Sequence, residues 1–194
     1  MESRKVTPLL SDSENVVIRE LFKTPKVEIE VIKDVLIKER REWERIVEDG
    51  RLQKEVDVRS ISKFKSLALK KIKKALTEFS DNFRLDRSVQ GRTKQEREED
   101  EKKINILLKN GVLIGYDFRD DRPVYLFYNI NKRAIIPWQD HSCHENCQEQ
   151  CFSILTTFRN EHGLDDPNQN IPIRKQFEAS IEEIIKKNKD RKEE

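Results

Sequence analysis

The sequence lacks long apolar runs. Hydrophobic residues make up 35% of the 194 residues, and no run of them approaches the ~20 residues with which a helix crosses a bilayer. The beginning of the chain, MESRKVTPLLSDSE, has no apolar core of the kind found in a secretory signal. We therefore expect a cytoplasmic protein that does not contact a membrane.

The sequence also lacks an excess of one charge, and it has few glycines and prolines. There are 39 Lys and Arg against 37 Asp and Glu, and charged residues make up 39% of the chain, compared with about 25% in ordinary soluble domains. Balanced charge at this density is typical of long solvated helices when the apolar residues are periodic. Because the five glycines and six prolines are few for a many-stranded protein, we expect a mainly α-helical fold.

The motifs of common enzymes are missing as well. There is no glycine-rich phosphate loop, no Gly-x-Ser-x-Gly and no HExxH. A catalytic cysteine could pair with a histidine such as His162, but nothing in the sequence activates one thiol over another. We therefore expect that the protein is not an enzyme.

Apolar spacing and end signals predict long amphipathic helices in the first half of the chain. Pro25, after a threonine cap, opens the first of them, and Gly50 closes it. The second begins at Ser60 or Ser62 and carries one apolar face. The run 15–22 before them is compatible with a short helix or with a strand.

A third helix and a β-hairpin follow. Thr93 and Glu96 form a capping-box pattern, in which each side chain bonds to the backbone N–H of the other residue, and Gly111 closes the helix. Two β-prone runs, 112–118 and 124–130, flank a polar turn and predict the hairpin.

The last third of the chain is predicted to be helical again. Pro137 should break the chain, and a helix after it should end at Gly163. The polar run 165–172 then forms a linker to a final amphipathic helix.

The order of helix, helix, capped helix, glycine and hairpin resembles that of a winged helix-turn-helix domain. The stretch INILLKNGVLIGYDFRDDRPVYLFYNI carries this resemblance, which covers residues 64–130. The predicted fold class is mainly α with one β-hairpin: a winged-helix-like core, which the resemblance implies, plus long flanking helices. The predicted units are an N-terminal helical segment able to dimerise (1–60), the winged-helix-like domain (61–136) and a unit with the cysteines and the C-terminal helices (137–194). The matching residues are Leu107, Leu108, Gly111, Val112, Leu113 and Ile114 before the turn and Tyr125, Leu126 and Phe127 after it.

The resemblance implies that the capped helix enters the major groove of double-stranded DNA with its first turn at the base edges. Arginine and glutamine can make paired hydrogen bonds to guanine and adenine. Arginines of the hairpin turn and lysines of the preceding helix would contact phosphates, which supply much of the affinity. The expected nucleic-acid-binding residues are Arg92, Thr93, Lys94, Gln95 and Arg97 of the capped helix, Arg119 and Arg122 of the turn, and Lys70, Lys73 and Lys74 of the preceding helix.

The acidic residues of the capped helix depart from this pattern. Between Arg92 and Lys103 five basic residues meet five acidic ones, and carboxylates repel phosphate. Only the first turn of this helix can therefore contact DNA. Alternatively, the helix is a solvated face with ion pairs one turn apart, and the lysines before it are the wet side of an amphipathic helix.

Three cysteines and two histidines fall within twelve residues, DHSCHENCQEQC, which end at Cys151. Inside a cell, clustered cysteines indicate metal ligands or redox-active thiols more than disulfides. The candidate metal ligands are His141, Cys143, His144, Cys147 and Cys151.

The spacing of these residues limits the geometry of a metal site. On one straight helix, Cys143 and Cys151 would lie ~12 Å apart, too far for a single Zn²⁺ with ligand distances of ~2.0–2.3 Å. Either a helix begins near Glu145 and the residues before it fold back, or two of the ligands form a half-site that another segment or chain completes. Zinc is the first expectation and an iron–sulfur cluster the second. A thiol redox switch and structural buried cysteines are the alternatives.

Two functions are compatible with these patterns. The first is a winged-helix-like DNA-binding protein, a transcriptional regulator that forms a homodimer and responds to metal or redox state through the cysteine segment. The second is a helical interaction or scaffold protein with a structural zinc site. Duplex binding that weakens steeply with salt would support the first, and self-association without affinity for nucleic acid would support the second.

Overall fold

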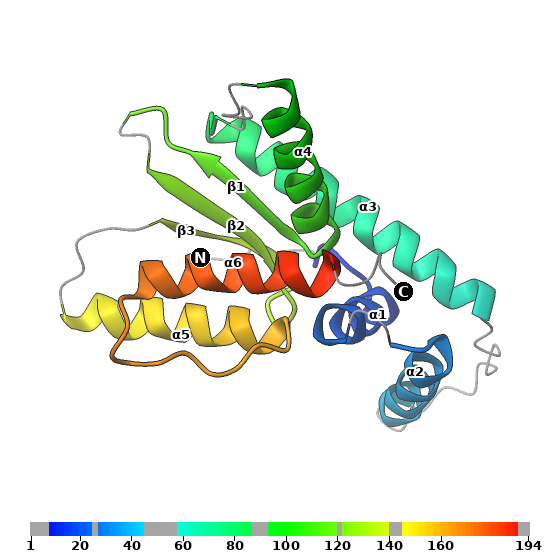
Figure 1. Cartoon of the computed structure of the whole chain (residues 1–194). Helices are drawn as coiled ribbons and strands as arrows, with labels where there is room; N and C mark the ends of the chain where they lie inside the picture. The colour runs from blue at the N-terminus through cyan, green and yellow to red at the C-terminus, as the bar shows by residue number, and fades with distance from the viewer. Residues whose placement is uncertain are drawn as a thin grey trace, which may run out of the picture.

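The computed structural model describes residues 8–24, 27–44, 58–86, 93–119, 122–139 and 145–189. Helices cover both faces of a three-stranded antiparallel sheet (Figure 1). The predicted class, mainly α with a β-hairpin, is confirmed. The elements are α1 (Asp12–Lys23), α2 (Ile29–Glu44), α3 (Val58–Asn82), α4 (Lys94–Lys109), β1 (Val112–Tyr116), β2 (Pro123–Asn129), β3 (Ala134–Gln139), α5 (Glu145–Glu161) and α6 (Ile173–Lys189).

The run 15–22, which the sequence left between helix and strand, lies in α1. Ser11 and Glu14 form a capping box: the Ser11 N–H donates to Glu14 Oε2 at 2.9 Å, and the Glu14 N–H donates to Ser11 Oγ at 3.4 Å. Both bonds satisfy backbone donors that a helix start leaves free. This local chemistry selects the helix.

The predicted hairpin is present and continues into a third strand. β1 pairs with β2, and β2 pairs with β3, so that Tyr125 faces Ile114 on one side and Trp138 on the other. The prediction that Pro137 breaks the chain was wrong, because Pro137 lies within β3. β3 is at the edge of the sheet, where a missing N–H need not remove a ladder bond.

The two faces of β2 enter two different hydrophobic cores, because side chains alternate along a strand. Tyr125 and Phe127 pack with residues of α4, α5 and α6. Leu126 and Tyr128 pack with residues of α1 and α3. A third cluster joins α1, α2 and α3. Residues from all three predicted units therefore share these cores, and the boundaries at 60 and 136 stay a prediction.

Gly111 joins α4 to β1 in the way the sequence predicts. Its φ is +69°, a conformation that other residues rarely adopt, and an added Cβ would lie 2.7 Å from Phe22 Cζ. Its carbonyl accepts the Tyr128 N–H at 2.8 Å. The glycine thus ends α4 and lets α1 pack against the beginning of the sheet.

Candidate functional site

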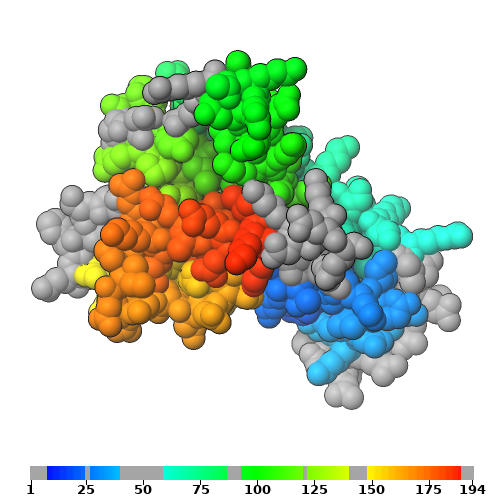
Figure 2. Space-filling view, in the orientation of Figure 1, coloured from blue at the N-terminus to red at the C-terminus, as the bar shows by residue number. Residues whose placement is uncertain are grey.

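The lysines of α3 lie opposite its buried face. Ala68, Ile72 and Leu76 are fully buried against the sheet and α1. We define the lysine face as Lys63, Lys70, Lys73 and Lys74, all exposed. In Figure 2, long side chains of α3 (cyan) project from the molecule. The amphipathic pattern of α3 therefore leaves a row of cations in solvent.

Most of the lysine face has no acidic partner among the described residues. Lys74 forms a long, exposed pair with Glu78 at 3.5 Å. The neighbouring Lys71 is different, because it bonds to both carboxylate oxygens of Glu14 at 2.7 and 2.8 Å and so links α3 to α1. Burial would raise the pKa of Glu14, but the hydrogen bonds from Lys71 and Ser11 outweigh it and hold that pKa below its ordinary value. Lys71 is thus a structural residue, and the lysine face remains available to a ligand.

The first turn of α4 is capped as the sequence predicts. The Thr93 N–H donates to Glu96 Oε2 at 2.8 Å, and the Glu96 N–H donates to Thr93 Oγ1 at 3.2 Å. Lys94, Gln95 and Arg97 are all exposed, and the Arg97 guanidinium donates to the Thr93 carbonyl at 3.4 Å. Arg92 lies outside the described residues. The cap already places a carboxylate at this helix N-terminus, so a phosphate would have to displace it or bind beside it.

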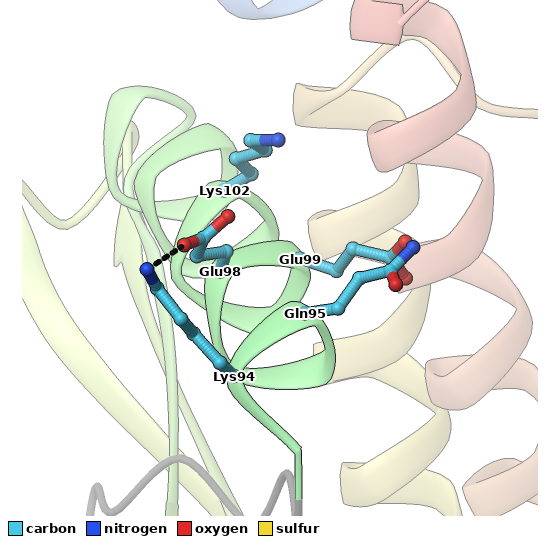
Figure 3. A pocket seen from close by; sticks show the side chains of 5 residues that line it. All are labelled: Lys94, Gln95, Glu98, Glu99 and Lys102. Carbon is cyan, nitrogen blue, oxygen red and sulfur yellow. Dashed lines mark ion pairs between the residues drawn. The ribbon is translucent and has the colours of Figure 1, made fainter.

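A shallow hollow of about 530 Å³ on α4 is lined by residues of both charges. Figure 3 shows Lys94 and Glu98 directed at each other, with their charged atoms 4.0 Å apart. Gln95 and Glu99 extend together on the side toward α6, and Lys102 completes the lining. The hollow is therefore nearly neutral and does not select anions.

The β1–β2 turn presents Arg119 and Arg122 to solvent. The Asp117 N–H donates to the Arg122 carbonyl at 3.0 Å, and Asp117 Oδ1 accepts the Arg119 N–H at 2.9 Å. The Arg119 guanidinium carbon lies 5.4 Å from the centre of the Phe118 ring, within the range of a cation–π contact. One backbone bond and one bond to the Asp117 side chain thus fix the described ends of the turn, where Arg119 and Arg122 are exposed.

The structure brings some of the predicted nucleic-acid-binding residues to one end of the molecule. The first turn of α4 and the β1–β2 turn both lie at the end where α3 finishes (Figure 1). A backbone bridge between Asp86 and Tyr116 fixes the segment after α3 to the end of β1. Lys70 lies twelve residues before the end of α3, roughly 18 Å away along the helix. The lysine face is therefore a neighbouring patch on α3, separate from the first turn of α4.

The structure describes only part of the cysteine segment. His141, Cys143 and His144 lie outside the described residues, and the side chain of Cys147 does as well. α5 begins at Glu145, so Cys147 and Cys151 are one helical turn apart. Cys151 is 4% exposed and belongs to the core beneath α5 and α6. No group of three His, Cys, Asp or Glu that could hold a metal occurs among the described residues.

His162 has a structural role in the core that the sequence did not indicate. Its side chain is buried, with Nδ1 2.8 Å from the Phe158 carbonyl and Nε2 3.0 Å from the Asn110 carbonyl. Desolvation lowers its pKa although both hydrogen bonds act to raise it. Cys151 lies eleven positions earlier, roughly 16 Å along a helix. Cys151 and His162 therefore do not form a catalytic pair.

The neighbouring Glu161 was not identified from the sequence. Its Oε1 accepts the N–H groups of Ile130 at 2.8 Å and Asn131 at 3.4 Å, which holds the β2–β3 turn against the end of α5. Its partners lie about thirty residues away in the chain, so no local pattern indicates this role.

Comparison with models of protein families, with curated proteins and with solved structures finds no match for this chain. Within the described residues, none of the helices combines the length and the apolar composition that crossing a bilayer requires.

Proposed function

We propose that the protein binds double-stranded DNA as a transcriptional regulator, in the manner of a winged helix. The lysine face of α3 would contact phosphates, and the first turn of α4 would lie at the base edges with Arg119 and Arg122 on the adjacent backbone. One observation carries this proposal. The lysine face is exposed, and Lys63, Lys70 and Lys73 have no acidic partner in the described part of the chain.

The charges of the two helices support different roles for them. α3 has seven basic and two acidic residues, whereas α4 has five of each. Release of counterions from DNA rewards basic residues that touch phosphate, so α3 should supply the affinity. α4 would add specificity through Gln95 and Arg97, which are exposed beyond the cap.

The proposal is tested by the salt dependence of duplex binding. A fluorescently labelled duplex is titrated with the wild-type protein and with K70Q/K73Q. The salt concentration is varied from about 50 to about 300 mM, a range that includes physiological ionic strength. If both lysines contact phosphate, the slope of log K against log salt should fall by about 2, since each contact contributes roughly 0.9. Affinity should fall on every duplex sequence alike.

The matched control is K175Q/K186Q, which removes two exposed lysines of α6 and changes the net charge equally. This variant should keep the wild-type slope. An equal loss of slope in both variants would mean that only net charge matters, and the lysine face would then not be a binding site. Charges are weakly screened at about 50 mM salt. If the protein does not bind a duplex under that condition, the proposal itself is rejected.

A scaffold function is the second candidate, and exposed apolar residues favour it. Val31 of α2 is 48% exposed and Leu67 of α3 is 40% exposed, although isolated exposed apolar residues are common. Sedimentation that shows a concentration-dependent dimer, with duplex binding absent, would select this function.

A further inference from the structure

The carboxyl group of Glu161 joins the end of α5 to the β2–β3 turn. Its Oε1 accepts the N–H groups of Ile130 and Asn131, and its Oε2 is buried without a hydrogen-bond partner among the described residues. Within the turn, Arg133 has a φ of +50°. A residue other than glycine keeps this left-handed conformation only where its surroundings enforce it. Contacts with the rest of the protein therefore hold the turn in its conformation.

The same turn holds the beginning of the described chain. The Arg133 carbonyl accepts the Leu9 N–H at 3.1 Å, and the Ile130 carbonyl accepts an N–H of the Asn15 side chain at 3.2 Å. The Arg133 guanidinium also pairs with Asp12 of α1. The beginning of the described chain, the turn and the end of α5 thus form one hydrogen-bonded unit.

The charged groups around Glu161 compensate little of its buried charge. The titratable and charged groups of the surrounding elements are Asp12, Glu14 and Lys23 of α1, Tyr128 of β2, Lys132 and Arg133 of the turn, His162 after α5 and Lys187 of α6. Lys23 attracts the carboxylate, but it is exposed, and water weakens the attraction of exposed charges. Burial raises the pKa of Glu161 to about 7, although the two backbone bonds and Lys23 act to lower it. The protonated form therefore suits the closed structure better than the ionised form does.

We propose that Glu161 is a proton-operated latch: in its protonated form it keeps residues 9–15 and the β2–β3 turn closed on α5, and its ionisation promotes opening of this unit while the sheet stays folded. Opening brings the carboxylate into water, which solvates the charge that the closed structure leaves buried. The equilibrium therefore shifts toward the open form as pH rises from 4.5, the ordinary pKa of the group, to the closed-state pKa of about 7. The unit contains none of the residues proposed to contact DNA.

Amide hydrogen exchange, measured by NMR on the wild-type chain, tests the latch. At each pH the rate expected for an unfolded chain is divided by the observed rate, which gives a protection factor free of the intrinsic pH dependence of exchange. The amides of Leu9, Ile130 and Asn131 should have nearly the same protection factor, which falls about thirtyfold or more between about pH 5 and pH 7 and then levels off. It should stay at least about tenfold below that of Tyr128, since local opening is easier than global unfolding. The Tyr128 N–H donates to the Gly111 carbonyl at 2.8 Å.

Two variants separate the latch from other sources of pH dependence. E161Q keeps an acceptor oxygen but cannot ionise, so the protection factors of the turn should not vary with pH. E182Q removes an exposed carboxylate of α6 and should reproduce the wild-type profile. The Ile171 amide, which donates to the Asn168 carbonyl at 3.1 Å between α5 and α6, should keep a constant protection factor in all three proteins.

Four outcomes would overturn the proposal. The first is constant protection of Ile130 and Asn131 in the wild type, and the second is a pH profile that persists in E161Q. The third is protection of these amides equal to that of Tyr128, because the turn would then open only when the whole protein unfolds. The fourth is a Leu9 amide that does not follow the turn. All but the second need only the wild-type chain, so they stay decisive if E161Q fails to fold.

Discussion

The buried carboxyl group of Glu161 should make the stability of this protein depend on pH. The residue is 6% exposed, and its Oε2 has no hydrogen-bond partner among the described residues. Burial raises its pKa from 4.5 to about 7, although the bonds from Ile130 and Asn131 act to lower it. The change to test is E161Q, which keeps an oxygen that can accept these two bonds but cannot ionise.

The magnitude follows from linkage. The folded protein holds the Glu161 proton more tightly than the unfolded chain does, so this proton stabilises the fold below pH 4.5. The stabilisation is lost as pH rises through the folded pKa of about 7. At 1.36 kcal/mol per pKa unit, the total is about 3 kcal/mol. Between pH 5 and pH 8, the free energy of unfolding of E161Q relative to wild type should therefore increase by roughly 2–3 kcal/mol.

Urea unfolding of both proteins at half-unit steps of pH measures this difference. His162 is present in both proteins, so its own titration largely cancels. E182Q, which removes an exposed carboxylate of α6, should run parallel to wild type at every pH. A constant difference between E161Q and wild type across this range, or a difference that shrinks as pH rises, would refute the reasoning.

Three further changes test other features. G163A places a Cβ 2.7 Å from the Lys23 carbonyl oxygen at a φ of +60°, and should lower the free energy of unfolding in urea by about 1–3 kcal/mol; unchanged stability would show that the close approach relaxes freely. R159M removes a buried guanidinium that bonds to a serine hydroxyl of α6 at 2.7 Å, and should lower the free energy of unfolding by about 1–3 kcal/mol. The control R174M removes an exposed ion pair and should lower it by less than about 1 kcal/mol. Equal losses of stability in the two variants would contradict the role of burial. Protein purified without oxygen should contain stoichiometric zinc, or iron with a brown colour, by elemental analysis and absorption, and C147S should lose it; metal-free, colourless protein would reject the metal site.

Elements with local signals were predictable from the sequence. The capping box at Thr93, the alternating apolar runs of the hairpin and the glycines after α4 and α5 all act within a few residues, so the chain shows them directly. The same signal was present at Ser11 and Glu14 but was overlooked, which left α1 uncertain. β3 was missed because a proline argues against a strand unless the strand lies at an edge, and edge position depends on the whole sheet.

The candidate site was less predictable because it depends on distant contacts. The exposure of the lysine face follows from helical periodicity, and the structure confirms it. The attachment of Lys71 to Glu14 crosses 57 residues, and the bond of His162 to Asn110 crosses 52. Cys151 was predicted as a metal ligand, and only tertiary packing reveals that it is buried. Whether it binds metal stays a prediction.

The proline of β3 also bears on how this protein behaves at high concentration. An approaching strand from another molecule would find no N–H at Pro137 and could not form a continuous ladder there. At the opposite edge, Asp86 already exchanges two backbone hydrogen bonds of 2.9 Å with Tyr116. Each edge of the sheet is therefore a poor template for strand addition. Concentrated solutions should resist cross-β aggregation for as long as the three-stranded sheet stays folded.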